Sequence, residues 1–336
     1  MCTAITYTTN EHYFGRNLDL EHSYNEKVTI TPRNFPVSFR HKQTMFTHFA
    51  IIGMAYVNNN YPLYFDAINE KGLGIAGLNF PDLASYNNVS DKKDNIASFE
   101  LILWILGQCK NISDVKNLLK TINITNEQFS DSLLATPLHW MVADKEKSIV
   151  IESLKKGLKV YDNPVGVMTN SPGFDFHLLN LNNYIGISSQ SPRNRFADTV
   201  KLKEYSRGMG AIGLPGDLSS SSRFIRAAFT KLNSRSLPDE KDSINQFFHI
   251  LGAVEQQNGC VCLNDGSYEI TLYSSCCNLD KGIYYYTTYK NHQITAIDMF
   301  KTDLNSNVLS EYSLIQEEQI NYIFPPAPPV SSKKQI

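Results

Sequence analysis

The chain begins MCTAITYTTNEHYFGRNLDL, residues 1–20. Residues 2–8 (CTAITYT) alternate apolar and polar side chains and are rich in threonine and β-branched types, which predicts a β-strand. Residues 13–19 (YFGRNLD) read as a second strand, with a turn around TTNEH between the two. Chain ends are usually frayed, so a hairpin here would be needed to hold the start of this chain inside a sheet.

Cys2 directly follows the initiator methionine. Methionine is removed efficiently when the next residue is small, and removal here would leave a thiol and a free α-amine on one residue. An α-amino group has a pKa of about 7.7–8.0, which suits a general base, and a thiolate is a strong nucleophile. Cys2 could therefore supply nucleophile and base without a histidine. The alternative is a reduced structural cysteine at the start of a strand.

The predicted hairpin would fold Arg16 and Asp19 back beside Cys2. The charge of Arg16 would stabilise a thiolate. Asp19 could hold the α-ammonium group through a charge-assisted hydrogen bond. The alternative for this pair is an ordinary surface ion pair.

Composition excludes several classes of function. The net charge of the 336 residues is −2 and no basic block is present, so we expect no nucleic-acid partner. No stretch approaches the ~18 consecutive apolar residues of a membrane span. The N-terminus lacks the apolar region of a secretory signal, so we expect a cytoplasmic protein with no membrane partner.

We expect neither a metal nor a cofactor. Cys260-Val-Cys262 and the adjacent Cys276 and Cys277 lack the spacing of structural zinc ligands. The segment from Gly208 to Gly213 matches GxGxxG, but no apolar strand precedes it, which favours a loop over a nucleotide site.

Serine-hydrolase chemistry is not indicated either, because the chain has no GxSxG motif. His139 and His249 lie in apolar runs (PLHWM and FFHIL), which predicts core histidines rather than catalytic bases.

The remaining pattern predicts one α+β domain over residues 1–325 and a flexible proline-rich tail over 326–336. Short, closely spaced strands favour antiparallel meanders over βαβ units. Further strands are predicted at 27–31, 48–57, 138–144, 148–154, 158–162, 268–275, 282–289 and 293–300. Helices are predicted at 97–109, 113–121, 222–232 and 243–257.

Five motifs together resemble the choloylglycine hydrolase family of cysteine N-terminal-nucleophile hydrolases. They are MCT, FGRNLD, NEKGLGIAGLNF, GVMTNSPGFD and GLPGDLSSSSRFIRAAF. The resemblance extends from Cys2 to about Met299 and is strongest to the bacterial enzymes that hydrolyse bile salts. It implies a four-layer αββα sandwich of antiparallel sheets, the N-terminal-nucleophile hydrolase fold.

The resemblance also implies roles for single residues. Cys2 matches the nucleophile, with Arg16 and Asp19 close to the thiol and the amine. Asn79 in AGLNF matches the side chain that donates to the oxyanion, and Asn170 in MTNSP matches the residue that holds the terminal amine. Arg223 in SSRFIR matches a second arginine near the thiolate. For each asparagine alone, turn chemistry is the simpler interpretation.

The implied substrates are conjugated bile salts, in which an amide joins a steroid acid to glycine or taurine. Positions matching the family's apolar substrate pocket are Leu18, Phe65, Phe129, Leu133 and Leu138, although ordinary core residues would look the same. Arg207 in EYSRGMG could pair with the sulfonate or carboxylate of the head group, with a weak preference for taurine conjugates. Relatives form homotetramers through a protruding loop, here residues 185–210, so a homotetramer is expected.

Three alternatives stay open at this point. The chain could be a penicillin V acylase-like enzyme or another amide acylase, although relatives of that kind often carry tyrosine where this chain has Asn79. It could be a non-catalytic protein that binds steroids or lipids. It could also transfer the acyl group from the thioester to another amine.

Overall fold

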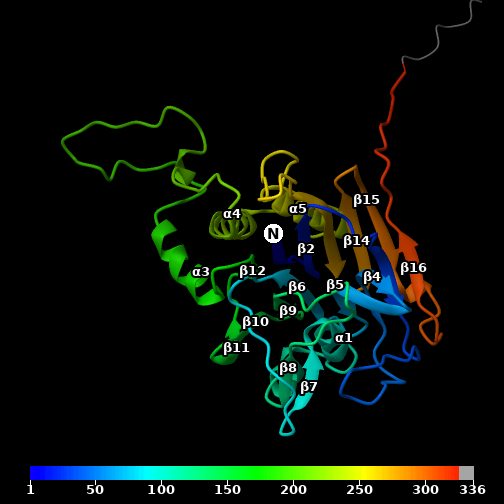
Figure 1. Cartoon of the computed structure of the whole chain (residues 1–336). Helices are drawn as coiled ribbons and strands as arrows, with labels where there is room; N and C mark the ends of the chain where they lie inside the picture. Colours follow the sequence, from blue (N-terminus) through cyan, green and yellow to red (C-terminus); the bar gives the residue numbers. More distant parts are fainter. Residues whose placement is uncertain (325–336) are drawn as a thin grey trace, which may run out of the picture.

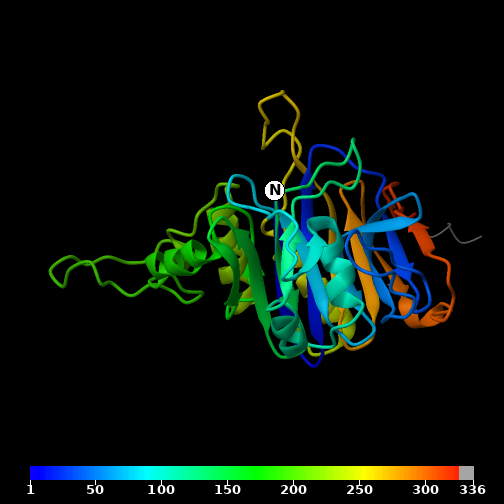
Figure 2. The same ribbon diagram turned by 60° about the horizontal axis from the view of Figure 1, so that its bottom comes forward.

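The computed structural model of the chain describes residues 1–324 (Figure 1). Its two large sheets lie face to face, and helices cover their outer sides (Figure 2). Among the described residues, no helix is long and apolar enough to cross a membrane. The predicted tail at 326–336 and residue 325 lie outside the described part, and the single domain over 1–325 stays a prediction.

The first sheet contains the N-terminal strand, with the order β12-β1-β2-β13-β14-β15 and antiparallel pairing throughout. The predicted opening hairpin is confirmed as β1 and β2. Because β12 pairs with the other edge of β1, the start of the chain lies inside a sheet and is held on both sides. The bounds are β1 Cys2–Thr8, β2 His12–Leu20, β12 Val167–Met168, β13 Ile270–Asn278, β14 Ile283–Thr288 and β15 Asn291–Asp298.

The second sheet has the order β11-β10-β9-β6-β5-β4-β3-β16, again antiparallel. A separate parallel pair, β7 and β8, departs from the predicted antiparallel pattern. The bounds are β3 Lys27–Thr31, β4 Ile51–Asn58, β5 Tyr61–Asn69, β6 Gly74–Asn79, β7 Asp94–Ala97, β8 Ile122–Thr125, β9 Leu138–Ala143, β10 Ser148–Leu154, β11 Gly157–Asp162 and β16 Ser310–Ser313.

The helices lie in two outer layers. Helices α4 and α5 contact β1, β2, β12 and β13, whereas α1 contacts β5 and β6. The α-helices are α1 Leu101–Leu106, α2 Ile112–Leu118, α3 Phe174–Asn180, α4 Ser220–Asn233 and α5 Glu240–Gly252. Short 3-10 turns lie at η1 Ser98–Glu100, η2 Leu181–Tyr184, η3 Met209–Ala211 and η4 Met299–Lys301.

Two apolar clusters hold these layers together. One joins the two sheets and the α4–α5 layer, and includes Phe14 and Phe247. The other lies between the second sheet and the α1–α2 layer, and includes Ile75 and Leu101. Strand β1 is buried on both faces because the first sheet is enclosed between the second sheet and the helices. The predicted αββα sandwich is confirmed.

The strands β5 to β8, β12 and β16 and the helix α3 were not predicted, and three further details differ from the sequence predictions. The strand expected from 48 begins at Ile51, because the Glu70 carboxylate accepts the N–H of Ala50 before the ladder starts. The helix expected from 97 begins with η1, where the Glu100 carboxylate accepts the N–H of Ala97 at 2.8 Å.

The third detail is His249, which is exposed rather than in the core. On α5 the buried face is formed by Ile244, Phe247, Ile250 and Leu251, and His249 lies on the other side of the helix. His139, in contrast, is buried as predicted. Its ring stacks on the ring of Phe80, and the two ring centroids are 4.1 Å apart.

Candidate active site

The β1–β2 register divides the predicted residues between two faces of one hairpin. Cys2 lies opposite Leu18, and Ala4 lies opposite Arg16. Side chains alternate along a strand and directly opposed residues share a face, so Cys2, Leu18 and Arg16 point the same way and Asp19 points the other. The face that carries Cys2 packs against the second sheet, since the Arg16 guanidinium donates hydrogen bonds to carbonyl oxygens of that sheet.

Arg16 is fully buried between the sheets. Its Nη1 donates to the carbonyl oxygen of Gly77 at 2.5 Å and to that of Phe65 at 3.2 Å. Within the described residues its Nη2 has no hydrogen-bond partner. Burial alone would lower the pKa of Arg16, but the negative charge available at Cys2, first among its neighbours, raises it. Arg16 therefore presents a fixed positive charge on the face that carries the Cys2 thiol.

Asp19 lies on the helix-facing side, fully buried with Arg223 of α4. Its Oδ1 accepts a hydrogen bond from the Thr271 hydroxyl at 2.6 Å, and its Oδ2 lies 3.9 Å from Nη1 of Arg223. Burial raises the pKa of Asp19 and lowers the pKa of Arg223. Both directions mean that desolvation outweighs the attraction between the two charges. A pair that is costly in this way is more readily explained by function than by stability.

Arg223 holds the main chain of Cys2. Its Nη1 donates to the carbonyl oxygen of Cys2 at 2.5 Å and to the Thr3 hydroxyl at 2.7 Å. Its Nη2 donates to Oδ1 of Asn170 at 2.8 Å. Helix α4 places this side chain in its first turn, after Ser219 caps the helix by accepting the N–H of Ser222.

Asn170 connects three predicted residues through one amide group. Its Oδ1 accepts the N–H of Cys2 at 2.7 Å as well as the Arg223 hydrogen bond. Its Nδ2 donates to the carbonyl oxygen of Asn79 at 2.7 Å. Asn79 ends β6 and is half-buried, opposite Leu138 of β9. The structure therefore brings Cys2, Asn170, Arg223 and Asn79 into one contiguous group.

Met1 is part of the described chain, so the nitrogen of Cys2 is still a peptide nitrogen. The Met1 amine donates to the carbonyl oxygen of Asp19 at 2.8 Å and to Oε1 of Glu269 at 2.7 Å. The Cys2 side chain is 2% exposed beneath it. Removal of Met1 would free the Cys2 amine beside Asp19, whose Oδ2 lacks a hydrogen bond among the described residues.

The predicted pocket residues fall into two groups. Leu18 is buried and Phe65 is half-buried, and both belong to the apolar cluster that contains Cys2. Leu138 packs against the other cluster, and Phe129 contacts the rings of Phe99 and Tyr61 there.

Leu133 lies in a tight turn, where its N–H donates to the carbonyl oxygen of Ser130 at 3.1 Å and its own carbonyl accepts the N–H of Phe129. The contacts in the structure join Leu18 and Phe65 to the Cys2 cluster. They place Phe129 and Leu133 on a separate loop.

Arg207 is exposed on the segment 185–210. This segment projects from the body beyond α3 in both ribbon views (Figures 1 and 2). Its neck is closed by a hydrogen bond from the N–H of Ser188 to the carbonyl oxygen of Gly210. The structure therefore does not bring Arg207 together with the residues around Cys2 in the same chain.

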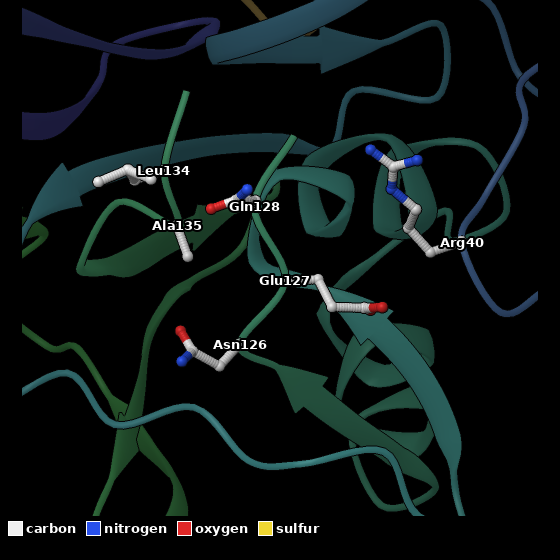
Figure 3. A pocket seen from close by; sticks show the side chains of 6 residues that line it. All are labelled: Arg40, Asn126, Glu127, Gln128, Leu134 and Ala135. Atoms are coloured by element: carbon white, nitrogen blue, oxygen red, sulfur yellow. The ribbon is translucent and has the colours of Figure 1, made fainter. Parts of the chain in front are cut away.

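A cavity of about 630 Å³ lies beside the loop that carries Phe129, and none of the predicted site residues lines it (Figure 3). Its lining is mostly polar and consists of Arg40, Asn126, Glu127, Gln128, Leu134 and Ala135. Within residues 1–324, no group of three or more His, Cys, Asp or Glu side chains is placed to hold a metal ion.

Two sets of buried polar residues around the site were missed by sequence analysis. His139 and His177 donate to the carbonyl oxygens of Thr169 and Asn170, at 2.8 and 2.9 Å, and so support the strand end that carries Asn170. Asp66 lies below Arg16 and accepts hydrogen bonds from three hydroxyl groups. A buried carboxylate in a strand is visible as Asp66 in YFDAIN, but its partners come from strands more than 200 residues away.

These features define a class: a hydrolase whose nucleophile would lie at the start of an interior strand of an αββα sandwich. The chain belongs to the family described as linear amide C–N hydrolases, choloylglycine hydrolase family, whose pattern matches residues 2–312. The resemblance found in the sequence is thereby confirmed.

Individual relatives agree over almost the full length. The chain is 56% identical to the bile salt hydrolase/transferase of Lactiplantibacillus plantarum, over 95% of this chain and 98% of that protein. It is 42% identical to the bile salt hydrolase/transferase of Clostridium perfringens, over 96% and 100%.

Solved structures give the same picture. The C2A mutant of conjugated bile acid hydrolase from Clostridium perfringens is 41% identical, with a TM-score of 0.89 over 96% of this chain and 100% of that chain. Penicillin V acylase from Agrobacterium tumefaciens shares the fold, with a TM-score of 0.70 at 20% identity over 93% of this chain and 91% of that chain.

Proposed function

We propose that the chain hydrolyses the amide bond that joins a bile acid to glycine or taurine, through a thioester on Cys2. The observation that carries this proposal is the hydrogen bond from the Cys2 nitrogen to Asn170 at 2.7 Å, with Arg223 on the Cys2 carbonyl. It orients the main chain of the one residue that could supply both nucleophile and base. The relatives named as bile salt hydrolases support the substrate class.

Maturation would begin with loss of Met1. The freed amine of Cys2 would keep Asn170 as an acceptor, while the carbonyl oxygen of Asp19 would lose the Met1 amine as its donor. The Asp19 carboxylate adds a negative charge on the same side of the strand. This environment would hold the amine beside the sulfur of its own residue.

Acylation follows from this placement. The Cys2 sulfur attacks the amide carbonyl carbon, and the negative oxygen forms between the Asn79 side chain and a backbone N–H. The Cys2 ammonium gives a proton to the leaving nitrogen as the C–N bond breaks. Free glycine or taurine leaves, and the bile acid remains bound as a thioester.

Deacylation uses the same groups in reverse. The Cys2 amine takes a proton from water, whose oxygen attacks the thioester carbonyl carbon. The C–S bond breaks, the sulfur leaves as the thiolate, the amine keeps the proton from water as an ammonium group, and the free bile acid leaves. These steps require only the chain and water.

The test is mass spectrometry of the purified protein, with and without a taurine-conjugated bile salt. We expect a mature mass that lacks Met1, a transient acyl adduct on the Cys2 peptide and release of taurine. The control is Cys2→Ala, which should bind the bile salt but release no taurine. Release by a chain that retains Met1 would exclude the mechanism, and binding without release by the wild type would favour a non-catalytic lipid-binding protein.

Asn79 offers a second test of the chemistry. Removal of one oxyanion donor typically lowers kcat by about 10²–10³, so Asn79→Ala should lose that factor with little change in KM. The same assay with penicillin V separates the acylase alternative. Penicillin V turned over faster than bile salts by the wild type would overturn the substrate assignment.

Acyl transfer is a second candidate activity, because both relatives above are named hydrolase/transferase. An amine that attacks the thioester in place of water would give a new conjugate and regenerate Cys2. Adding amino acids to the reaction should yield such conjugates, in amounts that rise with amine concentration.

For the substrate pocket we propose Leu18 and Phe65 in the cluster around Cys2, Leu138 opposite Asn79, and Phe129 and Leu133 on a separate loop. We also propose a homotetramer assembled through the segment 185–210, which exposes Ile185, Phe196 and Tyr205. Light scattering of the whole chain and of a chain with this segment shortened would test the assembly. A cytoplasmic location is supported by the six cysteines, all of which are free thiols.

A further inference from the structure

A second buried carboxylate lies behind the proposed site, in the layer between the sheets. Asp66 of β5 is fully buried. Its Oδ1 accepts a hydrogen bond from Tyr273 at 2.5 Å, and its Oδ2 accepts bonds from Ser275 at 2.9 Å and Tyr284 at 2.8 Å. Three hydroxyl donors converging on one carboxylate favour its charged form.

The hydrogen bonds also join Asp66 to Arg16. The main-chain N–H of Arg16 donates to the Ser275 hydroxyl at 3.2 Å, so the Ser275 proton points to Asp66. The Arg16 guanidinium donates to the carbonyl oxygen of Phe65, the residue before Asp66. Burial raises the pKa of Asp66 above its usual value and outweighs the lowering by Arg16 and by the three hydroxyl donors.

Among residues 1–324, the Arg16 guanidinium donates hydrogen bonds only to carbonyl oxygens, those of Asn17, Phe65 and Gly77. These neutral acceptors satisfy hydrogen bonds but do not balance a buried positive charge. On this face of the hairpin, the negative charges available to Arg16 are the Cys2 thiolate and the Asp66 carboxylate.

We propose that Asp66 is a positioning residue that balances the charge of Arg16 and so limits how strongly Arg16 stabilises the Cys2 thiolate. This inference rests on the proposed function, in which the sulfur loses its charge whenever the thioester forms. With Asp66 in place, Arg16 keeps a counter-charge throughout the cycle. Without it, the whole field of Arg16 would act on Cys2 and favour the thiolate over the thioester or the thiol.

Other ionisable groups face this pair from the neighbouring strands and from α4. Asp19 and Arg223 lie on the opposite face of the hairpin and partly offset one another. Tyr273, Tyr284 and Cys277 stay neutral near pH 7, because burial raises the pKa of each well above its usual range. Among the described residues, Asp66 is therefore the carboxyl group closest to Arg16 in the hydrogen-bond network.

The experiment measures the rate at which iodoacetamide alkylates Cys2 as a function of pH, in the mature wild type and in Asp66→Asn. Mass spectrometry of the Cys2 peptide is needed because Cys260 and Cys262 are exposed and will also react. Where the effective dielectric constant is near 20, removal of one nearby charge shifts a titration by about one pH unit or more. We expect the midpoint of alkylation in Asp66→Asn to move to lower pH by about that amount.

Tyr284→Phe is the matched control, since it removes a hydrogen bond from the same carboxylate and leaves both charges. Its midpoint should stay within about 0.3 pH units of the wild type. An unchanged midpoint in folded Asp66→Asn, or a shift to higher pH, would overturn the proposal. No bile salt is used, so this result is independent of the substrate assignment.

A double variant keeps the test decisive if Asp66→Asn fails to fold. Arg16→Gln with Asp66→Asn removes both charges together, which buried pairs tolerate better than removal of one. If the charges of Asp66 and Arg16 oppose one another at Cys2, the double variant should have an alkylation midpoint about one pH unit below that of Arg16→Gln alone. Equal midpoints in these two variants would show that the charge of Asp66 does not act on Cys2, contrary to the proposal.

Discussion

The two faces of the β1–β2 hairpin hold different parts of the proposed site. The face toward the second sheet carries the Cys2 thiol and Arg16, whereas the face toward the helices carries Asp19 and receives Arg223. Cys2 serves both because its sulfur points one way while its nitrogen lies in the plane of the sheet, bonded to Asn170 beyond β12. The two-residue alternation of a strand thus separates nucleophile from amine-holding groups within a few ångströms.

The largest effect is expected from a substitution on the face of the hairpin toward the second sheet. Cys2→Ala should lower hydrolysis by at least about 10⁴, because the nucleophile is lost. The free energy of unfolding should fall by only about 1 kcal/mol, since the buried side chain shrinks by one atom. Steady-state kinetics and urea unfolding of the same preparation check both numbers. Activity within tenfold of the wild type would remove Cys2 from the chemistry.

A substitution on the face toward the helices should instead lower the free energy of unfolding more than Cys2→Ala does. Arg223→Gln deprives the oxygens of Cys2, Thr3, Asn170 and Leu218 of their donor and should cost about 3 kcal/mol or more of unfolding free energy. The control is Arg226→Gln on the same helix, which loses a single bond to Gly216 and should cost about 1 kcal/mol or less. Equal losses in urea unfolding would contradict the structural role of Arg223.

A smaller effect appears in the pH dependence of stability on the helix-facing side. The folded pKa of Asp19 is raised above its ordinary value of 3.8, so the folded state binds the proton more tightly than the unfolded state. The contribution of Asp19 to stability is therefore present below 3.8 and is lost as pH rises through the raised folded pKa.

Asp19→Asn lacks this dependence. Relative to the wild type, the unfolding free energy of this variant should increase as pH rises from 3.8 through the folded pKa of Asp19. Its rate of hydrolysis should fall on the order of 10²-fold, because the amine loses a charged partner. Urea unfolding at a series of pH values measures the difference. A difference that is constant with pH would show that Asp19 is not shifted as described.

The smallest expected effect lies outside the hairpin. Arg207→Ala should change the unfolding free energy by less than about 0.5 kcal/mol, because the side chain is exposed on the projecting segment. Rates on matched glycine and taurine conjugates test its predicted role with the head group. A preference for glycine conjugates that survives the substitution would end that prediction.

Local pattern was enough to predict the hairpin, α2, α4, α5 and most strands, because each carries a clear period of apolar residues. It missed β5 to β8, β12, β16 and α3, although the family motif NEKGLGIAGLNF spans β6. It also predicted His249 as a core residue from its apolar neighbours alone. On α5 the burial follows the helical period, so two adjacent residues can have opposite environments.

The site residues were predicted from their match to a family, and their mutual geometry was not. Arg16 was predicted beside the thiol and Asp19 beside the amine, but the sequence did not predict that the two side chains point to opposite faces of one strand. Asp66, His139 and His177 had no pattern that marked them as support for the site, because their partners are distant in sequence. Such contacts are decided by sheet order and by which layer covers each face.

By itself the sequence determined the opening hairpin, the cysteine directly behind the initiator methionine and the family to which the chain belongs. Only the tertiary structure decided which side chains share a face with the sulfur and which hold its nitrogen. The physical reason is that strand periodicity is a local property of the sequence. The burial that acts on the pKa values of Asp19, Arg223 and Arg16 arises only when two sheets and a helical layer close over these side chains.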